Sequence, residues 1–172
     1  MPGIEIRDAK PGDEGLIREL AEATWWTTYE GIISGEQIRY MLDNLYDQRL
    51  LHAQLSTSEQ QYIILSDGDQ PGGFASYSER AEDPFTYKVN KLYVLPQNQG
   101  KGYGRKLLDI ISGRLRASQI KALELNVNRD NPALTFYTRY GFAVVRQEDI
   151  PIGPYWMNDY VMRLELGPSP IA

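Results

Sequence analysis

A glycine-rich stretch, Gln99-Gly100-Lys101-Gly102-Tyr103-Gly104, is the part of the chain best suited to hold phosphate groups. An apolar strand precedes it and ends at Pro96, and a helical run follows from Arg105. Glycine lets backbone N–H groups turn outward, because no Cβ blocks the approach of a ligand. The first turn of a helix adds unpaired N–H groups and the positive end of the helix dipole. The stretch therefore predicts a socket for phosphate oxygens.

Two common phosphate-binding motifs do not match this spacing. A nucleoside-triphosphate P-loop requires Ser or Thr after Gly-Lys, and Gly102 stands at that position. A dinucleotide fingerprint requires G-x-G-x-x-G, and its third glycine would fall at Arg105. The spacing disfavours both kinds of nucleotide-binding domain. A plain glycine-rich turn between strand and helix is the structural alternative.

A second pattern occurs at residues 131–142, after an intervening helix and strand. It reads Ala-x-x-x-Tyr-x-x-x-Gly-Phe, with Ala133, Tyr137, Gly141 and Phe142 at the fixed positions. An ordinary amphipathic helix with aromatic core residues would explain this pattern by itself. The two patterns in this order resemble the hallmarks of the GNAT family, the acetyl-CoA-dependent N-acetyltransferases. The resemblance covers essentially the whole chain.

The resemblance implies an α+β GNAT fold: a mixed, mostly antiparallel central sheet flanked by helices, with a splayed fourth strand. It also implies an enzyme that binds acetyl-CoA and releases coenzyme A. Backbone groups of Leu92, Tyr93 and Val94 would pair with the pantetheine arm and the acetyl carbonyl. Asn131 would hydrogen-bond the pantetheine, or cap the helix that begins at Pro132. The pyrophosphate would be held by main-chain amides of Gln99, Gly100, Lys101, Gly102, Tyr103, Gly104 and Arg105.

The same resemblance assigns Tyr137 as the acid that protonates the departing thiolate, a role open to a nearby phenol. A neutral amine would attack the thioester directly, and a backbone N–H of the splayed strand would stabilise the oxyanion. Many members carry Glu on the fourth strand where this chain has Asn90, which cannot act as a base. The remaining candidates are the carboxylates Glu30, Glu79 and Asp159, each acting through water or lying on the surface as a solvated charge.

Two aromatic and acidic segments are expected to bind the acceptor amine. One is residues 25–31, with Trp26 and Glu30, and the other is residues 155–160, with Trp156 and Asp159. Aromatic rings and carboxylates suit an ammonium group, although at least one of the two tryptophans at 25 and 26 is expected in the core. The pattern is similar to bacterial spermidine/spermine acetyltransferases, which implies a polyamine acceptor. Peptide N-termini, amino acids, antibiotics and a sensor without turnover are the alternatives.

The amino-acid composition excludes several kinds of metal site and disfavours several classes of partner. The chain has 172 residues, no cysteine and a single histidine, His52, which is expected on a helix surface. Disulfides, thiolate metal sites and multi-histidine metal sites are therefore excluded, and no metal is expected. The net charge of −5 disfavours nucleic acid as a partner. Without a signal peptide or long apolar run, a cytoplasmic protein with no membrane partner is expected, and a homodimer is left open.

Hydrophobic periodicity and turn residues predict where the helices and strands lie along the chain. The clearest amphipathic helix follows Ser34, which has capping-box spacing to Gln37. Other helices are expected after Pro11 and over residues 47–55, 104–115 and 132–141. Strands are expected at residues 4–6, 61–66, 73–79, 86–95, 122–127, 142–147 and 155–166. Residues 1–166 are expected to form a single acetyltransferase domain, and residues 167–172 a flexible tail.

Overall fold

The computed structural model describes residues 3–168 and contains seven strands and five α-helices in that part of the chain. Its helices are α1 (Glu14–Tyr29), α2 (Gly35–Leu45), α3 (Gln48–Thr57), α4 (Tyr103–Ala117) and α5 (Ala133–Tyr140), with a short 3-10 helix η1 (Pro96–Asn98). Its strands are β1 (Ile4–Asp8), β2 (Gln61–Asp67), β3 (Gln70–Arg80), β4 (Asp83–Val94), β5 (Ala122–Asn128), β6 (Ala143–Ile152) and β7 (Tyr155–Glu165). The expected tail lies mostly outside the described residues.

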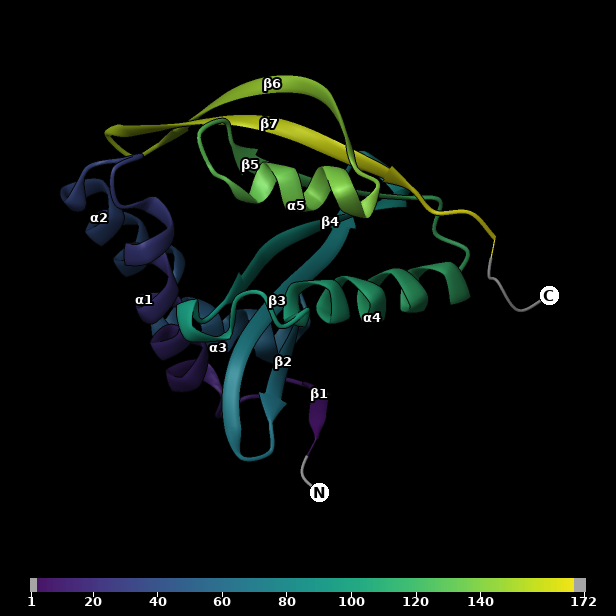
Figure 1. Ribbon diagram of the computed structural model, residues 1–172, viewed down its shortest axis with the longest axis horizontal. Helices are drawn as coiled ribbons and strands as arrows, with labels where there is room; N and C mark the ends of the chain where they lie inside the picture. The colour runs from purple at the N-terminus through teal and green to yellow at the C-terminus, as the bar shows by residue number, and fades with distance from the viewer. Residues whose placement is uncertain (1–2, 169–172) are drawn as a thin grey trace. The chain divides into compact units, whose positions relative to one another are not determined.

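The strands form one mixed sheet in the order β1-β2-β3-β4-β5-β7-β6 (Figure 1). The β4–β5 pair is parallel, whereas the β1–β2, β2–β3, β5–β7 and β6–β7 pairs are antiparallel. A mixed, mostly antiparallel sheet flanked by helices is the α+β fold expected from the sequence.

The chain divides into two compact units. Unit 1 comprises the described residues up to Tyr77 together with Lys91–Leu107, and unit 2 comprises Ser78–Asn90 and the described residues from Leu108 onward. Strands β3 and β4 and helix α4 each begin in one unit and end in the other.

Unit 1 is built on α1, α2 and α3 with the strands β1 and β2. The predicted cap of α2 is confirmed, because the Ser34 hydroxyl accepts a hydrogen bond from the Gln37 N–H at 3.0 Å. Helix α2 then buries Ile38, Met41 and Leu42. Each such side chain contributes about 1.5–3 kcal/mol when it leaves water. The apolar faces of these helices thus hold the first half of the chain together.

Unit 2 has its core on β5, β7 and the end of α5. Strand β5 shows almost no alternation of buried and exposed side chains, since Ala122, Leu123 and Leu125 are all buried. Such a run is typical of a strand covered on both faces. Gly141 follows the last residue of α5 and has a φ of 125°, and the next residue, Phe142, is buried.

Three strands depart from their expected bounds by three residues or more, and the first is β3, which begins at Gln70 rather than residue 73 because it pairs with β2 up to the turn. Strand β4 begins at Asp83 rather than residue 86, because Pro84 is tolerated at a strand start and Asp83 accepts the Phe85 N–H at 2.9 Å. Strand β6 continues to Ile152 rather than ending at residue 147, because it pairs with β7 all along a hairpin. Its pattern is almost entirely exposed, which hides it from a search for apolar alternation.

Candidate functional site

The glycine-rich loop follows β4 and η1 in unit 1 and leads directly into α4. Gly100 and Gly102 have φ of 84° and 81°, a backbone region that residues with a Cβ rarely adopt. No atom lies within 4 Å of an ideal Cβ on either glycine, so each glycine is required by conformation rather than by space. The turn that this loop makes therefore requires glycine at both positions.

The loop ends at the N-terminus of α4, which begins at Tyr103 rather than at the expected Gly104. The first N–H groups of a helix have no acceptor within that helix, and the dipole there is positive. Lys101 is exposed beside them and donates to Asn98 at 3.3 Å. Tyr103 anchors this end of the loop through a 3.1 Å hydrogen bond to Asp67. These donors suit a diphosphate group.

The strand before the loop carries Leu92, Tyr93 and Val94 at its end. The parallel β4–β5 ladder spans Thr86–Val89 and Ala122–Leu125, so these three residues lie beyond its last pair. Tyr93 packs with its ring 5.8 Å from Trp25, and its hydroxyl lies 3.1 Å from that of Tyr29. The strand end is thus fixed by aromatic packing in unit 1.

Tyr137 and Asn131 belong to unit 2, at α5 and its start. Tyr137 is buried, with its ring 5.8 Å from Phe142 in an edge-on arrangement. The Asn131 side chain accepts a hydrogen bond from the Ala133 N–H at 2.9 Å. Asn131 therefore bonds to the first residue of α5, as the capping alternative expects, although α5 begins at Ala133 rather than Pro132 and its N-cap residue is Pro132.

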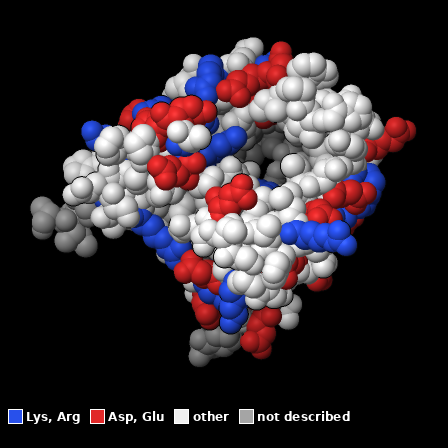
Figure 2. Space-filling view, turned by 180° about the vertical axis from the view of Figure 1, so that it is seen from behind, with Lys and Arg blue, Asp and Glu red and all other residues white. Residues whose placement is uncertain are grey.

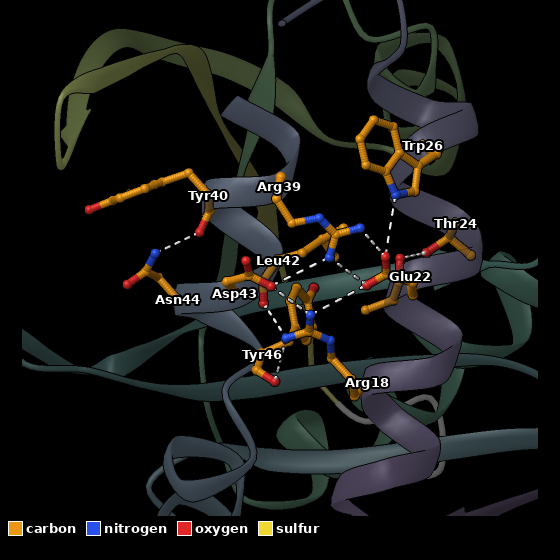
Figure 3. Close-up of polar contacts among 11 residues, drawn as sticks. Arg18, Glu22, Thr24, Trp26, Arg39, Tyr40, Leu42, Asp43, Asn44 and Tyr46 are labelled. Atoms are coloured by element: carbon orange, nitrogen blue, oxygen red, sulfur yellow. Dashed lines mark hydrogen bonds and ion pairs between the residues drawn. The ribbon is translucent and has the colours of Figure 1, made fainter. Parts of the chain in front are cut away.

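Trp26 lies on α1 in a network of charged residues that joins α1 to α2 (Figure 3). The Arg39 guanidinium stacks 5.5 Å from the Trp26 ring centre, and the indole N–H donates to Glu22 at 3.5 Å. Arg18 and Arg39 both pair with Glu22 and with Asp43. Arg39 thus occupies a face of Trp26 with a cation from the chain itself.

The other expected acceptor residues differ sharply in exposure. Glu30 follows α1 in unit 1 and is exposed. Trp156 on β7 is 57% exposed, an unusual value for tryptophan, whereas Trp25 is in the core as expected. Asp159, also on β7, is only 5% exposed. Figure 2 shows acidic and basic side chains intermingled over the face it presents.

The structure shows the surroundings of Asn90, which replaces the usual glutamate, and of Glu79, a candidate general base. Asn90 donates a hydrogen bond to the Ser78 hydroxyl at 2.8 Å, so its amide has a structural partner. Glu79 is exposed on β3, as a solvated charge would be. His52 is exposed on α3 and lies 3.4 Å from Glu14, in agreement with its expected surface position.

Sequence reasoning missed Lys91, which is buried in unit 1. Its ammonium donates to the Tyr62 hydroxyl at 2.7 Å and to Gln60 at 3.1 Å, and lies 5.3 Å from the centre of the Tyr46 ring. Burial lowers the pKa of Lys91 to about 8. The available signal was its strand position, because Lys91 shares a face with the buried Val89, two residues earlier.

Within the part of the chain that the structure describes, no helix is long and apolar enough to cross a membrane.

Comparison with known proteins assigns the family. The family model for the acetyltransferase (GNAT) domain matches residues 30–158. A spermidine N(1)-acetyltransferase of Thermoplasma acidophilum is 29% identical over 147 residues, covering 82% of this chain and 89% of that protein. An L-methionine sulfoximine/L-methionine sulfone acetyltransferase of Salmonella typhimurium is 32% identical over 100 residues, covering 55% and 58%.

A solved structure has the same fold over nearly its full length. The PaiA N-acetyltransferase of Thermoplasma acidophilum, in complex with coenzyme A, superposes with a TM-score of 0.82 at 26% identity, covering 95% of this chain and 99% of that one. The family match, the glycine loop at the start of α4 and the shared fold agree on one chemistry. The chain belongs to the GNAT family and is an acetyl-CoA-dependent N-acetyltransferase.

Proposed function

We propose that the protein transfers the acetyl group of acetyl-CoA to a primary amine of a polyamine such as spermidine. The observation that carries this proposal is the similarity to a spermidine N(1)-acetyltransferase over 82% of the chain. A buried carboxylate at Asp159, an exposed carboxylate at Glu30 and an exposed indole at Trp156 support a cationic acceptor.

Residues of unit 1 hold the donor in this proposal. Main-chain amides of the segment from Gln99 to Arg105 bind the pyrophosphate, and Lys101 within this segment adds a positive charge. Backbone groups of Leu92, Tyr93 and Val94 bind the pantetheine arm and the acetyl carbonyl, and an N–H there stabilises the oxyanion. Acetyl-CoA supplies the activated acyl group as a thioester.

Unit 2 carries other residues that have a role in this proposal. Tyr137 gives its phenolic proton to the departing sulfur, and packing against Phe142 fixes the direction of its ring. The side-chain oxygen of Asn131 accepts a hydrogen bond from the Ala133 N–H, and its amide N–H groups donate to the pantetheine. In unit 2, Trp156 and Asp159 bind the acceptor.

A substrate panel tests the proposal. Release of free coenzyme A is measured with spermidine, spermine, an amino-terminal peptide, L-methionine sulfone and an aminoglycoside, each at the same acetyl-CoA concentration. The proposal expects the highest kcat/KM with the polyamines. Turnover of the peptide, the sulfone or the aminoglycoside without turnover of spermidine would refute the polyamine acceptor. Tight acetyl-CoA binding without turnover of any amine would instead favour a sensor.

A further inference from the structure

Asp159 has a carboxylate oxygen that the fold leaves without a partner. Its Oδ1 is buried and forms no hydrogen bond to any described residue. Its Oδ2 accepts a hydrogen bond from the Asn126 amide at 3.3 Å. A buried acceptor without a donor destabilises the fold, and more so when it is charged. Such an atom in a folded protein calls for an explanation, and a ligand donor is a common one.

The backbone around Asp159 is held firmly. Strand β7 pairs there on both sides, with Asn128 of β5 and Glu148 of β6. The Asp159 carbonyl accepts a 3.2 Å hydrogen bond from Arg129, whose guanidinium also contacts Asp149 at 2.8 Å. A group held this rigidly keeps its direction when a substrate arrives, which is a requirement of a site that acts on protons.

The neighbouring carboxylates of unit 2 are already engaged. Glu124 pairs with Arg163 at 3.0 Å and Arg80 at 3.4 Å. Glu148 pairs with Arg146 at 2.9 Å. Asp159 has no such ion pair among the described residues, which leaves its charge available to a ligand cation.

Charged groups on three sides act on Asp159. Lys88 on β4 and Arg129 after β5 favour its charged form, whereas Glu148 on β6 opposes it. Burial is the largest effect and raises the pKa of Asp159 above its usual range, against the hydrogen bond from Asn126. A carboxylate with a raised pKa holds a proton more readily near neutral pH, as a base must when it accepts one.

We propose that Asp159 binds the ammonium group of the acceptor and removes the proton that must leave before the amine can attack. This inference rests on the proposed function and supplies the base that Asn90 cannot provide. The step breaks one N–H bond of R–NH₃⁺, and the proton passes to the carboxylate directly or through one water. The nitrogen lone pair so freed forms the C–N bond as the C–S bond breaks. The electron pair of the C–S bond leaves on sulfur, and the thiolate takes a proton from Tyr137. The nitrogen, now bound to the acyl carbon, gives up its second proton to water, and Tyr137 regains a proton from water.

The test compares Asp159→Asn with Glu165→Gln, which removes an exposed carboxylate from the same strand. Acetyl transfer is followed across the pH range with the amine that the wild type uses best, and acetyl-CoA affinity is measured by titration. Asp159→Asn should lower kcat/KM by about 10²-fold or more while acetyl-CoA affinity is retained. Glu165→Gln should match the wild type. Full activity of Asp159→Asn at neutral pH would overturn the proposal.

A second variant separates catalysis from a structural role. Asn126→Ala removes the donor to Oδ2, which raises the pKa of a carboxylate, so the acidic limb of the pH profile should move to higher pH. An unmoved limb would overturn the proposal, even if Asp159→Asn were inactive or unfolded. If spermidine fails as a substrate and another amine is acetylated, the polyamine assignment is refuted and Asp159 is judged on that other amine.

Discussion

Lys91 makes the stability of the fold depend on pH in a direction that can be measured. Lys91 as a residue is 8% exposed, its ammonium bonds to Tyr62 and Gln60, which are neutral, and burial lowers its pKa from 10.5 to about 8. In the unfolded chain the side chain keeps its proton up to the ordinary value. Between these two values the unfolded state binds more protons, so the free energy of unfolding rises with pH.

The magnitude follows from the two pKa values. The full difference corresponds to about 3 kcal/mol, at about 1.4 kcal/mol for each pH unit. From about pH 8 to about pH 9.5 the expected gain is about 1.5 kcal/mol, because folded Lys91 is half protonated at the start of this interval. The measurement is urea unfolding at several pH values within this interval.

Lys91→Met should remove the contribution of Lys91 to this slope, whereas Lys88, whose pKa burial also lowers, continues to contribute. The substitution leaves the buried polar neighbours with partners, since Tyr62 still donates to Gln54 at 2.6 Å and Gln60 still accepts from Ser76 at 2.8 Å. Lys10→Met, at an exposed lysine of the same unit, should keep the wild-type slope. A wild-type stability that stays flat across the interval, or an equal slope in Lys91→Met, would refute the burial argument.

Two further predictions concern residues that are proposed to bind acetyl-CoA and to protonate the departing thiolate. Gly102→Ala places a side chain at a φ of 81° and should weaken acetyl-CoA binding measured by calorimetry. Gly113→Ala, at an equally open position inside α4, should raise stability by up to about 1 kcal/mol and leave that affinity unchanged; equal affinities in both variants would remove the loop from the donor site. Tyr137→Phe should lower kcat about 10²-fold or more with little change in acetyl-CoA affinity. Full activity with chemistry rate-limiting would make Tyr137 a packing residue.

The sequence predicted the fold because its local signals agree with one another. Ser34 caps α2, and the apolar positions after it have the helical period that the core uses. The glycine loop was recognisable because positive φ at Gly100 and Gly102 restricts the choice of residue. Where backbone conformation restricts the choice of residue, the spacing of glycines was sufficient to predict the loop.

The acceptor side was harder to predict because side-chain surroundings depend on tertiary contacts. Nothing in the sequence near Trp26 shows that Arg39, thirteen positions later, covers its ring. The unpartnered oxygen of Asp159 likewise depends on three strands that meet only in the folded sheet. The burial of Lys91 could not be predicted from its residue type, because lysine side chains are usually exposed.

The most direct test of the proposed function is mass spectrometry of spermidine after incubation with the purified protein and acetyl-CoA. The account predicts a singly acetylated spermidine, formed together with an equal amount of free coenzyme A, and no product when acetyl-CoA is omitted. Unmodified spermidine in a reaction where the same protein acetylates a peptide or an amino acid would contradict the polyamine acceptor.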